Sequence, residues 1–234
     1  MSSTIKRNGV LAVILFIVYL SQNILRNIFV NMLAINELVA TLITVMVFGA
    51  LAIFLVKKDN YFKVRCTSKT CITYIIIVTL ILSVINLFPF DLSIGITTLS
   101  VFFTMLFVGL MEELIFRGCI YKICDEKWGD QKAVILSSVL FGLIHIINVL
   151  NDDILMVVLQ MVYATCIGIV YAMLMYKKQG IILCILAHAI VNIAGNLGAT
   201  ETVYKEIIFT IICVVFAIIM IFRFDLLKKA NRNF

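Results

Sequence analysis

A few ionisable side chains interrupt the apolar stretches of this sequence, and they are of the kinds that activate water. The chain holds two histidines, His145 and His188, and each lies within a long apolar run. Glu112 and Glu113 lie side by side in another such run. Because ionisable groups in apolar segments are costly and usually face a partner or a water-filled cavity, each of them is a candidate for function.

Helical spacing places the two glutamates in different surroundings. Arg117 follows Glu113 by four residues, so these side chains share a helix face and can neutralise each other. Glu112 points about 100° away around the helix and has no cation of its own in that helix. The sequence therefore predicts that Glu113 and Arg117 form a structural ion pair and that Glu112 is free for chemistry.

Two further pairs have the same four-residue spacing. His188 and Asn192 share one helix face, and Phe141 and His145 share another, where Phe141 would pack beneath the site. A single cavity could then receive Glu112, His145, His188 and Asn192. In such a cavity a desolvated carboxylate is a better general base, one histidine can orient a water, and a histidine with an amide can donate to an oxyanion. This set suits hydrolysis of a peptide bond.

The elements that must carry these residues are membrane helices. The 234-residue chain is 63% hydrophobic and 14% charged, with a mean hydropathy of +1.14, which is far more apolar than a typical soluble domain. Its apolar runs match the length of about 20 residues that a membrane-spanning helix needs. We therefore expect an all-α polytopic membrane bundle with about eight transmembrane helices, at residues 8–30, 37–56, 70–88, 96–119, 133–150, 154–176, 180–197 and 206–224.

Lysine and arginine concentrate in alternate connections between these helices. By the positive-inside rule this pattern predicts that both termini are cytoplasmic, with Arg26 and Lys205 as exceptions. The clusters are Lys6 and Arg7; Lys57, Lys58, Lys63, Arg65 and Lys69; Lys122, Lys127 and Lys132; Lys177 and Lys178; and Arg223, Lys228, Lys229 and Arg232. The net charge of +6 is thus a signal of topology, and no motif indicates a nucleic-acid partner.

Three ordered motifs carry a resemblance to a known family: Glu112-Glu113-x-x-x-Arg117, Phe141-x-x-x-His145 and His188-x-x-x-Asn192. Together they resemble the CaaX protease and bacteriocin-processing family (CPBP, also called Abi) of intramembrane proteases, which includes the type II prenyl-protein endopeptidases. The resemblance divides the chain into N-terminal transmembrane helices at 1–95, a catalytic core at 96–197, and a C-terminal helix with a basic tail at 198–234.

The resemblance also implies roles for these residues. Glu112 and His145 would activate the nucleophilic water, His188 and Asn192 would form the oxyanion site, and Glu113 and Arg117 would support them. The expected partners are the lipid bilayer and a prenylated or hydrophobic peptide, such as a bacteriocin precursor or a signalling peptide. The small size of the chain favours a protein of a bacterial plasma membrane. The resemblance to bacterial members of the family implies a role in peptide maturation or bacteriocin immunity.

Alternatives remain at this stage. Glu112, His145 and His188 could be three zinc ligands with an open position for water, although the chain has no His-Glu-x-x-His pair, and the resemblance favours catalysis without a cofactor. The fold could also serve as a non-catalytic scaffold or immunity factor. A proton-coupled transporter would usually be larger and show two related halves.

In straight, upright helices, Glu112 and His145 would lie at different depths in the membrane and would not meet. His145 lies about 20 Å from Lys132 along its helix, whereas Glu112 lies close to the cytoplasmic end of the expected helix 96–119. Tilted helices, or a fifth span that begins outside the membrane near Trp128, would bring the two side chains level.

Overall fold

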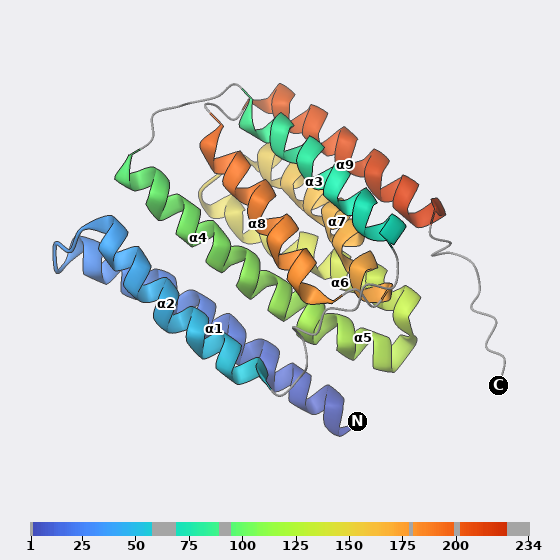
Figure 1. Cartoon of the computed structure of the whole chain (residues 1–234), viewed down its shortest axis with the longest axis horizontal. Helices are drawn as coiled ribbons and strands as arrows, with labels where there is room; N and C mark the ends of the chain where they lie inside the picture. Colours follow the sequence, from blue (N-terminus) through green and yellow to red (C-terminus); the bar gives the residue numbers. More distant parts are fainter. Residues whose placement is uncertain (1, 58–68, 89–94, 178–179, 199–201, 224–234) are drawn as a thin grey trace.

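The computed structural model describes residues 2–57, 69–88, 95–177, 180–198 and 202–223, and these form helices (Figure 1). This confirms the all-α prediction. The helices are α1 (Ser3–Asn31), α2 (Glu37–Val56), α3 (Lys69–Leu87), α4 (Ile96–Glu113), the π-helix η2 (Leu114–Ile120), α5 (Tyr121–Trp128), α6 (Asp130–Leu143), the 3₁₀-helix η3 (Ile144–Leu150), α7 (Ile154–Tyr176), α8 (Ile181–Leu197) and α9 (Val203–Arg223).

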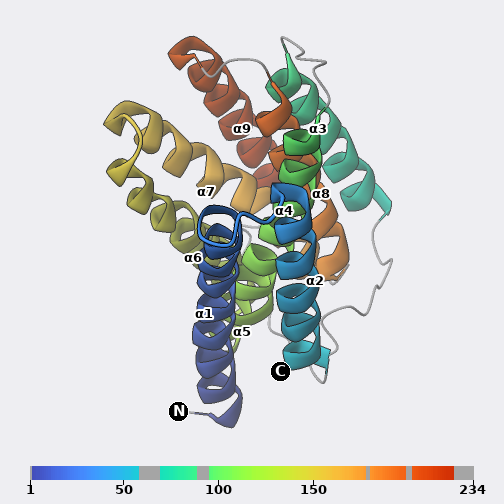
Figure 2. The same cartoon turned by 90° about the vertical axis from the view of Figure 1, so that its left-hand side faces the viewer.

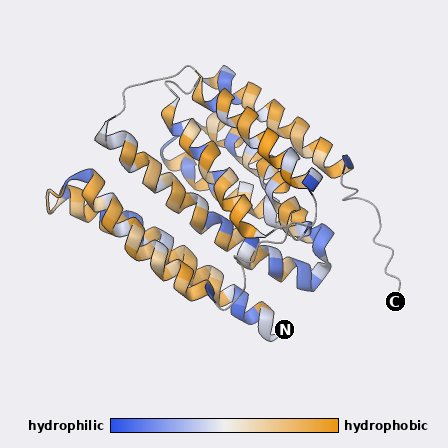
Figure 3. Ribbon diagram, viewed as in Figure 1, coloured by the Kyte–Doolittle hydropathy of each residue, from blue (hydrophilic) through white to orange (hydrophobic). Residues whose placement is uncertain are grey.

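Each of the eight predicted spans contains an apolar helix. Seven helical stretches in the described residues are long and apolar enough to cross a membrane, and α8 is a shorter apolar helix of 17 residues. Hydrophobic residues dominate the helix surfaces, and hydrophilic ones gather on α5 and near helix ends (Figure 3). The chain is therefore an integral membrane protein.

The cytoplasmic placement of both termini stays a prediction. Several of the residues on which it depends lie outside the described part of the chain, as does the expected end of the last span at Phe224. These are Lys58, Lys63, Arg65, Lys178, Lys228, Lys229 and Arg232.

Polar side chains fix the hairpin of α1 and α2. The Asn36 side chain accepts hydrogen bonds from the backbone nitrogens of Leu38 (3.0 Å) and Val39 (3.4 Å), which caps the start of α2. Between the helices, Gln22 donates to the Thr44 hydroxyl at 3.0 Å, and both side chains are buried. Such bonds hold helices together where lipid offers no alternative partner.

Helix α4 lies at the centre of the bundle. The hairpin of α1 and α2 lies on one side of it, and α8, α3, α7 and α9 lie on the other (Figure 1). Seen from the side, α1 and α2 stand in front, while α6 and α7 slant away from α1 at one end (Figure 2). Residues of α4 therefore face both halves of the protein.

The helix that begins with α4 extends further than predicted. The range 96–119 was too short, because α4, η2 and α5 follow one another without a break and a single apolar stretch runs over Thr97–Trp128. Hydropathy falls after Cys119, but Tyr121 and Cys124 are buried and keep one face of α5 on the protein. The next helix begins at Asp130, not at residue 133, directly after Gly129 with φ of 85°.

This longer hairpin resolves the difficulty of depth. Glu112 lies 17 residues before Gly129, and His145 lies 16 residues after it. Because α5 and α6 pack against each other on either side of that glycine, the two side chains are carried to similar depths.

Helices α6 and α7 approach closely at two glycines. A Cβ on Gly142 would collide with the Thr165 hydroxyl and lie 2.6 Å from the Met161 carbonyl oxygen. A Cβ on Gly168 would lie 3.0 Å from Ser138 Cβ and 3.2 Å from an Arg117 guanidinium nitrogen. Small residues at such crossings let helix backbones pack closely in membranes.

We predict that Gly142→Ala lowers thermal stability in detergent, because α6 and α7 must separate; overpacking of this kind costs about 1–3 kcal/mol. Gly9→Ala is the matched control, since a Cβ there meets nothing within 4 Å. It should leave the melting temperature unchanged or raise it slightly through better helix propensity. Equal melting temperatures for Gly142→Ala and the wild type would contradict the close crossing.

Candidate active site

One cavity of about 470 Å³ receives all four side chains that the sequence singled out for catalysis. Glu112 enters from the end of α4, His145 from η3, and His188 and Asn192 from α8. The three helices that position these residues are the ones predicted from the motif spacing.

His188 lies between the two adjacent glutamates. Its Nδ1 is 2.8 Å from Glu113 Oε1, and its Nε2 is 3.4 Å from Glu112 Oε2. Neighbouring residues of a helix point about 100° apart, which lets the two carboxylates face opposite edges of one imidazole ring. Because a carboxylate can only accept, Nδ1 donates its hydrogen to Glu113 and leaves Nε2 to face Glu112 and the cavity.

Glu113 and Arg117 form the expected ion pair, with 2.8 Å between Arg117 Nη1 and Glu113 Oε1. Both side chains are completely buried. Arg117 also donates from Nη2 to the Gly168 carbonyl oxygen at 3.2 Å, which joins η2 to α7. The prediction of a purely structural pair omitted one contact, since the same Glu113 oxygen that binds Arg117 also accepts from His188.

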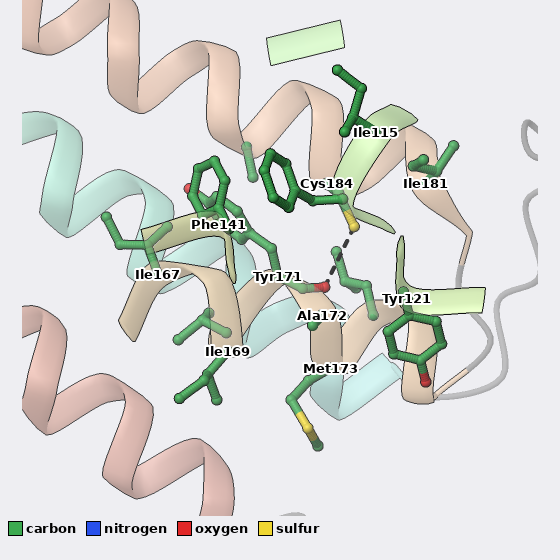
Figure 4. Packing of buried hydrophobic residues seen from close by; sticks show 14 of the residues in the cluster. Ile115, Tyr121, Phe141, Ile167, Ile169, Tyr171, Ala172, Met173, Ile181 and Cys184 are labelled. Carbon is green, nitrogen blue, oxygen red and sulfur yellow. Dashed lines mark hydrogen bonds between the residues drawn. The ribbon is translucent and has the colours of Figure 1, made fainter. Parts of the chain in front are cut away.

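Phe141 lies at the centre of the site. Its ring packs edge-on against His145 at 5.2 Å and His188 at 5.5 Å between centroids, and the Arg117 guanidinium lies 4.5 Å from its centroid. Figure 4 shows it in the buried cluster near Tyr171. Phe141 thereby holds both histidine rings at fixed orientations.

The His145 ring is oriented by its own helix. Nδ1 lies 2.9 Å from the carbonyl oxygen of Phe141, four residues earlier. A carbonyl only accepts, so Nδ1 carries the hydrogen, and in the neutral ring Nε2 keeps its lone pair. A half-buried histidine of this kind can accept a hydrogen bond from a water in the cavity.

Helix α8 is anchored one turn before His188. The Cys184 thiol donates to the Tyr171 carbonyl oxygen at 3.4 Å, which links α8 to α7 (Figure 4). One turn after His188, Asn192 lines the cavity, and its backbone carbonyl accepts from the Asn196 side chain at 2.9 Å. Asn192 is thus a residue of the cavity wall on the same helix as His188.

Zinc stays an alternative to the predicted metal-free site. Among the described residues, no three histidine, cysteine, aspartate or glutamate side chains are grouped as metal ligands are. Nδ1 of His145 is bonded to a backbone carbonyl and Nδ1 of His188 to a carboxylate, contacts that metal-ligating histidines also make. No catalytic step below passes through a metal at Glu112, His145 and His188.

Sequence reasoning missed several polar residues that line the same cavity. Gln160 accepts from the Asn148 side chain at 2.7 Å, and Lys205 donates to the Asn86 carbonyl oxygen at 2.7 Å. Tyr19 reaches the cavity from α1. Uncharged polar residues inside apolar helices were the available signal, because they tend to bond a neighbouring helix or line a cavity.

Comparison with known proteins assigns the central part of the chain. Residues 93–194 match the family described as Rce1-like, type II CAAX prenyl endopeptidase. No curated protein matches the chain. The matched segment contains Glu112, His145, His188 and Asn192 and the helices that bring them together. Through residues 93–194, the chain is thus similar to the Rce1-like type II CAAX prenyl endopeptidases, a family of proteases.

Proposed function

We propose that this protein is an intramembrane endopeptidase that uses Glu112 to activate a water without a metal. The observation that carries the proposal is the shared cavity of Glu112, His145, His188 and Asn192, in which Glu112 and Glu113 both reach His188. A carboxylate next to an oriented imidazole, with an amide at the same wall, is a set of groups able to hydrolyse a peptide bond.

The positions of these groups support the following proposed reaction. Glu112 accepts a proton from the water as the water oxygen attacks the peptide carbonyl carbon, and His145 orients that water through Nε2. The Asn192 amide, and Nε2 of His188 when it carries a hydrogen, donate to the oxyanion. The carbon–nitrogen bond then breaks, and the proton passes from Glu112 to the leaving amine, which yields one carboxylic acid and one amine.

Glu113 and Arg117 act on this reaction through His188. Glu113 holds the Nδ1 edge of the ring, and Arg117 neutralises Glu113 in a fully buried position. We propose that they are positioning residues, which set the direction in which Nε2 points.

The proposed substrate is a prenylated or otherwise hydrophobic peptide. Phe16 and Leu20 on α1 and Ile144 and Ile147 on η3 give the cavity apolar walls, while amide side chains line other parts of it. In a bacterial plasma membrane, such substrates include bacteriocin precursors and signalling peptides, and cleavage would serve their maturation or self-immunity. A non-catalytic scaffold of the same fold is the alternative.

The first test is peptide cleavage by the purified protein in detergent, on a panel of prenylated and hydrophobic leader peptides. Glu112→Gln removes the proton acceptor while keeping the side-chain size, so we expect the rate to fall roughly 10²–10⁴-fold. Addition of a chelator should leave the wild-type rate unchanged.

Glu37→Gln is the matched control, since Glu37 binds Arg26 in the α1–α2 hairpin. It should cleave at the wild-type rate. A chelator-sensitive rate would favour the zinc alternative, whereas equal product from the wild type and Glu112→Gln would favour the scaffold.

A second test asks whether the Glu113–Arg117 pair orients His188 for catalysis or only stabilises the fold. Arg117→Met leaves the buried Glu113 charge without its cation, and breaking a buried pair in this way costs about 3–5 kcal/mol. Glu113→Leu with Arg117→Met removes both charges and should recover much of the melting temperature. Its cleavage rate should nevertheless stay low, because Nδ1 of His188 has lost its acceptor. A double variant that is both stable and fully active would leave the pair a packing role only.

A further inference from the structure

Helix α1 contributes to the active-site cavity although it lies outside the segment that matches the family. Phe16, Tyr19 and Leu20 line the same cavity as Glu112 and His188. The family match begins at residue 93, so this wall is not part of the matched core. Of the three side chains, the tyrosine alone can donate a hydrogen bond.

The Tyr19 ring is held in place by the helix that carries the catalytic glutamate. It packs against Phe107 of α4, with 6.2 Å between ring centroids and 35° between ring planes. Phe107 is buried, and α1 also contacts η2, which directly follows Glu112 and Glu113. The Tyr19 ring is thus packed on α4 where it lines the cavity.

The hydroxyl of Tyr19 is available to a ligand. It makes no hydrogen bond to another described residue, in contrast to the Tyr74 hydroxyl, which donates to the Phe216 carbonyl oxygen at 3.0 Å. Tyr19 and Glu112 line the same cavity. A substrate that enters this cavity with its carbonyl beside Glu112 therefore also meets the wall that Tyr19 forms.

We propose that Tyr19 is a further catalytic residue, whose phenol donates a hydrogen bond to the carbonyl oxygen of the scissile peptide as negative charge develops on it. The inference rests on the proposed function, because it assumes hydrolysis at Glu112. Asn192 on α8 and Tyr19 on α1 would hold that oxygen from two helices, with Phe16 and Leu20 contacting the apolar part of the substrate.

Tyr19→Phe tests this directly, since it keeps the ring packed on Phe107 and removes only the donor. Removal of an oxyanion donor typically lowers kcat by about 10²–10³-fold, so we expect a loss of roughly 10- to 100-fold where a second donor remains, with KM changed little. Tyr74→Phe is the matched control and should keep the wild-type kcat. Melting temperatures of both variants separate loss of the donor from loss of folding.

A second measurement uses a hydrophobic peptide aldehyde, whose hydrate resembles the tetrahedral intermediate. It should raise the melting temperature of the wild type and of Tyr74→Phe more than that of Tyr19→Phe. If Tyr19→Phe keeps the wild-type kcat and the full thermal shift, the inference about Tyr19 is overturned. The proposed function is then still tested separately, by Glu112→Gln. Equal cleavage by the wild type and Glu112→Gln would instead overturn the proposed function and this inference with it.

Discussion

The contact of one imidazole with two carboxylates is the constraint on which the rest of the site depends. His188 can meet Glu112 and Glu113 only if α8 lies very close to the end of α4. Gly109, one turn before Glu113, makes this possible, because a Cβ there would lie 3.1 Å from Ala189, the neighbour of His188. The site therefore depends on close packing of two backbones as much as on its polar groups.

The same contact brings charge into the interior of a membrane protein. Burying the Glu113 charge would be costly without a partner, and Arg117 provides one through an ion pair. The Arg117 guanidinium in turn packs on the Phe141 ring and donates a hydrogen bond to the Gly168 carbonyl oxygen. Gly168 must lack a side chain to admit this arrangement. Helices α4, η2, α6 and α7 are thus joined around the buried Arg117, which neutralises the carboxylate bonded to Nδ1 of His188.

Much of this architecture could be predicted from the sequence. Long apolar runs gave α2 and α7 the bounds that the structure has, and four-residue spacing placed His188 with Asn192 and Glu113 with Arg117 on shared faces. The extension through α5 could not be predicted from hydropathy, because Tyr121 and Cys124 stabilise a helix whose other face is polar. The hydrogen bond between Glu113 and His188 and the position of Tyr19 at the cavity depend on how separate helices pack. Helical periodicity within one segment does not predict that packing.

The arrangement of the site depends most on the orientation of the His188 ring. NMR can test this orientation directly, because the chain holds two histidines and their signals can be compared. In protein labelled with ¹⁵N-histidine, NMR reports which ring nitrogens carry hydrogen. We predict a hydrogen on Nδ1 of both rings, with the His188 Nδ1–H signal showing a strong hydrogen bond that is weakened in Glu113→Gln while His145 is unaffected. An Nδ1 of His188 without hydrogen, or a signal unchanged by Glu113→Gln, would contradict the arrangement of the site.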